Sequence, residues 1–321
     1  MMTEAVRRPQ HLTTGIATIV ASVLAMSIAD TIIKSSSAHF TLWQVYVLRS
    51  LLVIPTLIAM MRLRRSPIDL RAVLKPWVIL RSLLLAFMYV ALYAAIPVLS
   101  LPVIAASAYT GPLFIALLSA LLIGEPVGGR RWLAIAIGFG GVLLVIRPAA
   151  ADFSPLALIP VGSALLYALA AIITRSKCAA EAPPVLGLAL NLGLLILGGA
   201  MSALLASWQP SLPDGAAYPF LLGPWGTTGL REWGILAVLA VLMLGISIGL
   251  AKAYQSAPPS IIATFDYSYL LFAGLWSYLV FAEAPNLPTM AGMALIALAG
   301  WLVVGRPSPT VRQVATTKAL P

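Results

Sequence analysis

Residues 82–124 contain no charged side chain, and this is the feature that most limits what the chain can fold into. Four further stretches, 153–174, 182–213, 233–251 and 284–305, also lack Asp, Glu, Lys and Arg. A helix rises about 1.5 Å per residue and crosses a hydrocarbon core of ~30 Å in about 20 residues. The first stretch is therefore long enough for two crossings. Because lipid offers no hydrogen bonds, such segments predict an all-α integral membrane protein.

The composition agrees with this interpretation. Of the 321 residues, 61% are hydrophobic and 9% are charged, whereas about a quarter of the residues of a soluble protein are charged. Hydropathy and the turn residues between apolar runs predict ten membrane-spanning helices. We expect these helices over residues 12–36, 43–61, 76–98, 102–123, 132–147, 154–175, 184–206, 233–255, 260–282 and 287–305.

Lys and Arg residues gather on one side of the predicted topology. With the N-terminus in the cytoplasm, fifteen of the 20 Lys and Arg residues are cytoplasmic, and only Lys34, Arg147 and Arg231 lie on the opposite side. Cytoplasmic loops of membrane proteins carry this excess of positive charge. We therefore expect both termini in the cytoplasm. Membrane topology accounts for the net charge of +10, so no nucleic-acid partner is expected.

Several classes of site are absent from the sequence. Cys178 is the only cysteine, which excludes an internal disulfide and a Cys-rich metal site. The sequence lacks the G-x-x-x-x-G-K-[ST] phosphate loop, which excludes ATP-driven pumping by this chain. His11 and His39 lie outside the predicted spans. We therefore expect no metal, no cofactor and no enzymatic activity.

An internal repeat relates the two halves of the chain. Residues 109–125 (YTGPLFIALLSALLIGE) align with residues 267–283 (YSYLLFAGLWSYLVFAE), and GGVLLVIRP at 140–148 aligns with AGWLVVGRP at 299–307. Each half holds five predicted spans, so the halves enter the membrane from opposite sides. We expect a first repeat at 12–148, a second at 149–307, and cytoplasmic tails at 1–11 and 308–321. Such inverted repeats are typical of carriers that work by alternating access at a midplane cavity.

The motifs of this repeat closely resemble those of the drug/metabolite transporter superfamily, EamA family. These motifs are the Gly-Pro pair at 111–112 and the segment LIGEPVGGRRWLAIAIGFGGVLLVIRP at 122–148. The scaffold residues that carry the resemblance are Gly111, Pro112, Glu125, Arg147, Glu283 and Arg306. Leu270 stands where the second half should match Pro112, and Ala282 stands where it should have a glycine, so we expect the ninth span to be straighter than the fourth.

Membership of this family implies a secondary carrier of small organic metabolites. Its central cavity would be lined by the first, third, fourth, sixth, eighth and ninth spans. Within the family the chain looks most similar to the YddG-like branch of bacterial amino-acid exporters. Branches that move riboflavin or S-adenosylmethionine have similar sequences, and the quoted motifs do not separate these substrates. The resemblance also implies a multi-pass protein of the bacterial inner membrane, acting as a monomer or a homodimer.

Ionisable side chains inside spans are the first candidates for function, because burying a charge in lipid costs at least ~2.5–3.5 kcal/mol. Asp30 and Lys34 are four residues apart on one helix face, and either gate the cavity, bind substrate or neutralise each other. We expect Arg49 to pair with Asp30 or a helix end. Arg81 is one turn into its span, where its side chain is expected to reach the cytoplasmic surface.

A second candidate pair flanks the turn at Ala257–Pro259. Lys252 and Asp266 would lie at similar depth on antiparallel helices. They form either an ion pair or a coupling site at which Asp266 binds a proton, which makes protons a candidate coupling ion.

Aromatic side chains near span centres are candidates for an apolar cavity that accepts a flat or aromatic substrate. We expect Tyr89, Tyr93, Tyr109, Tyr167, Tyr267 and Trp276, together with Asp266, to line this cavity. Core packing is the alternative role for each of these aromatic residues. The function that follows is the export or facilitated movement of amino acids, including aromatic ones. A carrier of a vitamin or nucleoside-type metabolite, a channel and a lipid-embedded scaffold remain as alternatives.

Overall fold

A computed structural model of the chain describes residues 11–37, 39–63, 70–95, 110–124, 128–146, 158–208, 219–282 and 286–304, with isolated positions between them. Every regular element in these ranges is a helix. The elements are α1 (Leu12–Ser36), α2 (Leu42–Leu63), the 3-10 helix η1 (Leu70–Leu74), α3 (Pro76–Ala94), α5 (Gly111–Ile123), α6 (Gly129–Ile146), α7 (Leu158–Ser176), α8 (Pro183–Trp208), α9 (Pro219–Leu222), α10 (Leu230–Ser256), α11 (Pro259–Asp266), α12 (Ser268–Phe281) and α13 (Leu287–Val304).

Within the described ranges, six helices are long and apolar enough to cross a membrane: α1, α2, α3, α7, α8 and α10. Two shorter apolar helical stretches, Gly111–Ile123 and Trp132–Leu144, lie in α5 and α6. The all-helical fold is confirmed for this part of the chain, and each of the ten expected spans overlaps a helix. The number of crossings and the side on which the termini lie stay predictions.

Proline residues mark where several helices begin. Pro76 begins α3 and Pro259 begins α11, since proline suits the first helical turn, where its missing N–H would have no partner. The residues before them, Lys75 and Pro258, are extended, as steric contact with the proline ring requires. The tight turn expected at Ala257–Pro259 is therefore present between α10 and α11.

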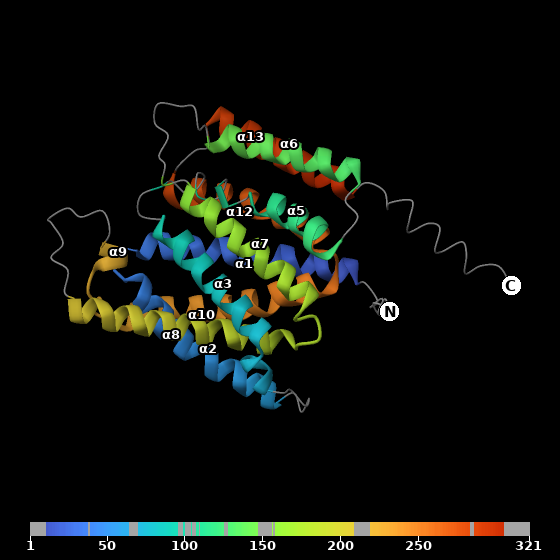
Figure 1. The fold of residues 1–321 in the computed structure, drawn as a ribbon. Coiled ribbons are helices and arrows are strands. Elements are labelled where there is room, and N and C mark those ends of the chain that lie inside the picture. The colour runs from blue at the N-terminus through green and yellow to red at the C-terminus, as the bar shows by residue number, and fades with distance from the viewer. Residues whose placement is uncertain are drawn as a thin grey trace.

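Helix α1 lies in the middle of the bundle, where it packs along α10 and also contacts α11 and α12. Helix α2 packs on α8, and α3 packs on α7 and α8. Helices α6 and α13 pack on each other and form a separate layer, at the top of Figure 1. Their contacts with the rest of the bundle are few.

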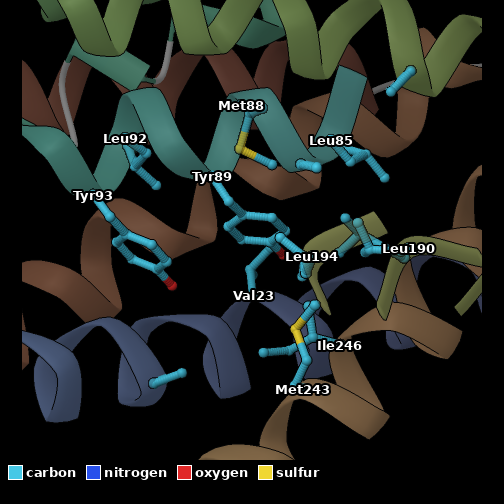
Figure 2. Close-up of a cluster of buried hydrophobic side chains, with 14 of the residues drawn as sticks. Val23, Leu85, Met88, Tyr89, Leu92, Tyr93, Leu190, Leu194, Met243 and Ile246 are labelled. Atoms are coloured by element: carbon cyan, nitrogen blue, oxygen red, sulfur yellow. The ribbon is translucent and has the colours of Figure 1, made fainter. Parts of the chain in front are cut away.

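The centre of the bundle is a continuous apolar cluster. Figure 2 shows part of it, with Tyr89 of α3 directed toward Val23 of α1 and toward Met243 and Ile246 of α10. Small residues allow some helices to approach closely. A Cβ on Gly198 of α8 would lie 3.1 Å from the carbonyl oxygen of Trp43 in α2, so packing of small residues holds these two helices together.

Arg81 contradicts the expectation that it reaches the cytoplasmic surface. Its side chain is 2% exposed. Its Nε donates a hydrogen bond of 2.7 Å to Thr174 Oγ1, and its Nη1 donates one of 3.3 Å to the carbonyl oxygen of Leu186. The expectation was wrong because α7 and α8, which are distant in sequence, supply acceptors for the guanidinium within the bundle.

The ninth span contains an interruption even though Leu270 stands where a proline was expected. The chain breaks between α11 and α12 at Tyr267, where the N–H of Leu270 donates to the carbonyl oxygen of Tyr267 in a short i to i+3 bond of 3.1 Å. In the first half, α5 begins at Gly111, directly after a turn at Thr110. A tightened turn can interrupt a helix without a proline. Much of the first half of the fourth span lies outside the described residues, so the expected difference in straightness stays a prediction.

The two helices after these breaks end alike. Gly124 after α5 has φ 63° and ψ 28°, and Ala282 after α12 has φ 53° and ψ 21°. Both are left-handed, a conformation that costs an L-residue about 1–2 kcal/mol and costs glycine little. The repeat predicts matching helix ends at these two positions.

We expect Ala282→Gly to raise the free energy of unfolding by about 0.5–1 kcal/mol, because glycine removes the backbone strain but adds freedom to the unfolded chain. The matched control is Gly124→Ala. No atom lies within 4 Å of a Cβ at that position, so this change tests backbone strain alone and should lower stability by about 1 kcal/mol. Thermal unfolding in detergent measures both changes. A lower melting temperature for Ala282→Gly would contradict the argument.

Candidate functional site

A cavity lies in the interior of the bundle, with a volume of about 50 Å³ available to the centres of water molecules. This is room for roughly three to five waters. Its walls come from α1, α3, α5, α7, α11 and α12, and from Ile104 and Ala108 before α5. The lining residues are Met26, Asp30, Met88, Leu92, Ile104, Ala108, Gly111, Pro112, Ser163, Ala164, Tyr167, Asp266 and Tyr269.

Asp30 of α1 is one of two carboxylates in the cavity wall. It is 3% exposed. Its Oδ1 accepts a hydrogen bond of 2.8 Å from Tyr93 Oη, and its Oδ2 accepts one of 2.6 Å from Tyr269 Oη. Tyr93 belongs to α3 and Tyr269 to α12, so Asp30 links three helices. Hydrogen bonds to a carboxylate are stronger than those between neutral groups, so this arrangement fixes the carboxylate at the wall.

Asp266 is the second carboxylate, and it lies at the end of α11, directly before the break at Tyr267. It is 2% exposed, and its Oδ2 accepts a hydrogen bond of 3.3 Å from Tyr254 Oη of α10. Tyr254 also contacts Tyr167 of α7 edge to face, with ring centroids 6.0 Å apart. The helix break thus places a carboxylate against the aromatic side of the cavity.

The structure places two of the side chains expected in the cavity, Tyr167 and Asp266, in its wall, together with the candidate gating residue Asp30. Tyr89 and Tyr93 lie behind the α3 wall, stacked on each other with ring centroids 5.9 Å apart (Figure 2). Tyr93 still acts on the cavity because it donates to Asp30.

Two more of the expected aromatic residues, Trp276 and Tyr267, are not among the residues that line this cavity. Trp276 of α12 donates from Nε1 to Ser27 Oγ of α1 over 3.1 Å. Tyr267 packs against α6, where its hydroxyl would lie 3.1 Å from a Cβ on Gly138. Both residues therefore join helices in this conformation.

The lysines expected as gating or coupling residues are not among the residues that line the cavity. Lys34 Nζ lies 4.6 Å from the ring centroid of Phe281, which links α1 to α12 by a cation–π contact. Lys252 is exposed, whereas Asp266 is buried and bound to Tyr254. The proposed Lys252–Asp266 ion pair is therefore not formed. Tyr254 is two residues beyond Lys252, and residues two apart on a helix face different directions.

Among the scaffold residues of the resemblance, Gly111 and Pro112 begin α5 and form part of the cavity wall. Tyr109, Glu125, Arg147, Glu283 and Arg306 lie outside the described residues. The eighth span, α10, does not line the cavity directly, but it supplies Tyr254 to Asp266. The other five spans expected around a central cavity all contribute to its lining.

Sequence reasoning missed Tyr269 as a partner of Asp30, because the two residues are 239 positions apart. It also missed the apolar wall of Met26, Met88 and Leu92. The sequence did offer one signal that Tyr269 faces the cavity. Tyr269 is three residues beyond Asp266, and residues three apart lie on the same face of a continuous helix. The break at Tyr267 removes that simple geometry.

Comparison with known proteins identifies the class of molecule. The profile of the EamA-like transporter family matches residues 13–147. A riboflavin transporter of Rhizobium johnstonii is 32% identical over 234 residues, which cover 71% of this chain and 70% of the relative. A riboflavin transporter of Vibrio cholerae is 31% identical over 190 residues, and this alignment spans only 57% of that relative.

Two further matches extend over nearly the whole chain. The pseudopaline exporter CntI of Pseudomonas aeruginosa is 25% identical over 289 residues, 90% of this chain and 95% of the relative. A solved crystal structure matches with a TM-score of 0.64 and 19% identity, covering 91% of this chain and 96% of that one, which shows a shared fold. From the family profile and these matches, the chain belongs to the EamA-like transporter family and is a multi-pass membrane transporter.

Proposed function

We propose that this transporter is a secondary carrier for small amino-acid-like metabolites and that it moves them out across a bacterial inner membrane. Two buried carboxylates, Asp30 and Asp266, in the wall of a mostly apolar cavity carry the proposal. A carboxylate in this position attracts an amine or another cationic group. Tyr167 and Tyr269 offer aromatic surfaces for the rest of the substrate.

The size of the cavity supports alternating access as the mechanism. About 50 Å³ is too little space for an amino acid, so binding requires that the walls move. The inverted repeat supplies two five-helix units that can rearrange about a midplane site. Small cavity volume and a rearranging wall are properties of a carrier, whereas a channel needs a continuous conducting path.

A carrier of a flat vitamin is the second candidate, and the riboflavin transporters among the relatives favour it. Riboflavin is uncharged over most of its ring system and would depend on stacking against Tyr167 and Tyr269 more than on Asp30. S-adenosylmethionine, which carries both a sulfonium cation and an amino-acid group, would use the carboxylates as an amino acid does. These substrates therefore differ in their expected dependence on Asp30.

Counterflow in proteoliposomes tests the proposal. Vesicles loaded with one unlabelled amino acid should take up the same labelled amino acid, and saturating amounts of a true substrate should stop the uptake. Riboflavin and S-adenosylmethionine are tested in parallel. Cells that express the protein should also resist a toxic amino-acid analogue. If vesicles exchange riboflavin and no amino acid, the second candidate replaces the first. If no metabolite of the panel is exchanged, the carrier proposal fails in favour of a scaffold.

A further inference from the structure

Helix α2 carries a buried face of hydrogen-bond donors that the cavity described above does not use. Tyr46, Arg49 and Ser50 lie at positions i, i+3 and i+4 and therefore share one face of the helix. Their exposed fractions are 0%, 1% and 0%. Tyr46 Oη, Arg49 Nε and Nη2, and Ser50 Oγ have no hydrogen-bond partner among the described residues.

Arg49 is the member of this face that requires explanation. A guanidinium stays protonated under all conditions a protein meets, and a cation in the membrane interior is normally paired. Arg49 and Asp30 interact electrostatically, but the hydrogen bonds to the Asp30 oxygens come from Tyr93 and Tyr269. What Arg49 does contact is the ring of Tyr46, 5.6 Å from Cζ to the centroid. A cation held in this way among hydroxyl donors is suited to an anionic acceptor.

The donor face adjoins the cavity through a single side chain. The rings of Tyr46 and Tyr93 have centroids 6.3 Å apart, and Tyr93 in turn donates to Asp30 in the cavity wall. Tyr93 thus lies between the cavity and the face of α2. The cavity must enlarge to admit a metabolite, and displacement of Tyr93 from Asp30 would bring the face of α2 into the cavity wall.

We infer that Tyr46, Arg49 and Ser50 bind the carboxylate of the substrate while Asp30 binds its amine, so that the carrier selects zwitterions. This inference rests on the proposed function and specifies its substrate class. Arg49 supplies the positive charge and can form a bidentate contact with a carboxylate. The hydroxyl groups of Tyr46 and Ser50 donate the remaining hydrogen bonds to the carboxylate. An amine without a carboxylate leaves the donor face unfilled and binds more weakly.

The test compares amino acids with the amines that lack the carboxylate. The pairs are L-phenylalanine with phenethylamine, L-methionine with 3-methylthiopropylamine, and L-lysine with cadaverine. Affinity is measured by thermal shift and by competition in counterflow. The wild-type protein should bind at least one amino acid about tenfold or more tightly than its amine, because a charged hydrogen-bonded contact is lost in the amine.

The variants assign that preference to the donor face. Arg49→Gln should bring the ratio of amino-acid to amine affinity close to one by weakening the amino acid alone, and Arg49→Lys should restore part of the ratio because it keeps the charge. Tyr46→Phe and Ser50→Ala each remove one hydroxyl and should lower the ratio by a few-fold. If the Arg49 variants do not fold, the ratios of these two hydroxyl variants decide the question.

Two outcomes would overturn the inference while the carrier role stands. The first is a wild-type protein that exchanges metabolites but binds the amines as tightly as the amino acids. The second is a set of folded variants in which the ratio is unchanged, or in which both affinities fall equally, as a purely structural role of Arg49 would predict. A wild-type protein that exchanges nothing would remove the proposed function and this inference together.

Discussion

Asp30→Asn is expected to abolish transport of amino-acid substrates while leaving the protein folded. Asparagine has the shape of aspartate but no charge, so the substrate amine loses its counter-charge at the cavity wall. Removing one partner of a buried, hydrogen-bonded charge pair costs about 2–5 kcal/mol, or roughly 30- to 5,000-fold in the dissociation constant. Binding by thermal shift and counterflow in proteoliposomes measure the loss.

Tyr93→Phe and Tyr269→Phe are the matched controls for Asp30→Asn. Each removes one hydrogen bond to the carboxylate and retains its charge, so substrate binding should weaken less than in the asparagine variant. The melting temperature without substrate should stay within a few degrees of the wild-type value in all folded variants. Full counterflow of amino acids by Asp30→Asn would show that the carboxylate does not bind the substrate.

Asp266→Asn is expected to remove the response to a pH gradient while counterflow continues, because Asp30 still offers a carboxylate to the substrate amine. If Asp266 carries the coupling proton, asparagine resembles its protonated form permanently and prevents proton movement. For one-to-one exchange, a pH step of one unit supports at most about a tenfold concentration ratio of substrate. Wild-type vesicles should approach that ratio, whereas Asp266→Asn vesicles should equilibrate without accumulation and retain counterflow.

Lys252→Gln is the control for the proton-coupling experiment. Lys252 was the expected partner of Asp266 but is exposed, so its removal should leave the pH-driven accumulation unchanged. Accumulation that persists in Asp266→Asn would assign coupling to another group. A wild-type protein that ignores the gradient would be a facilitator, and Asp266 would then have no coupling role.

Much of the helical framework could be predicted because it depends on local hydropathy. The expected span 12–36 coincides with α1, and the span 233–255 lies within α10 (Leu230–Ser256). Asp30 and Asp266 could be named as candidates because a carboxylate in an apolar segment is conspicuous in the sequence. In each case the signal lies within one helix and needs no knowledge of its neighbours.

The partners of these residues could not be predicted in the same way. Asp30 binds Tyr269, and Arg81 binds Thr174 and Leu186, across long separations in sequence. These contacts depend on how helices rotate about their axes and which neighbours they meet, and hydropathy carries little information about either. Of the two alternatives for Lys252 and Asp266, the ion pair is not formed. The sequence indicated the depth of these residues in the membrane but not the direction that each side chain faces.

The pairing of α6 with α13 also affects how the molecule can change shape. These two helices are the last helices of the two expected halves, and they pack along each other (Figure 1). Their described residues are absent from the cavity lining. Their mutual contact can therefore persist while the other helices exchange neighbours. The free-energy differences between conformations would then arise among a few buried polar contacts, and the interface of α6 with α13 would stay constant throughout the cycle.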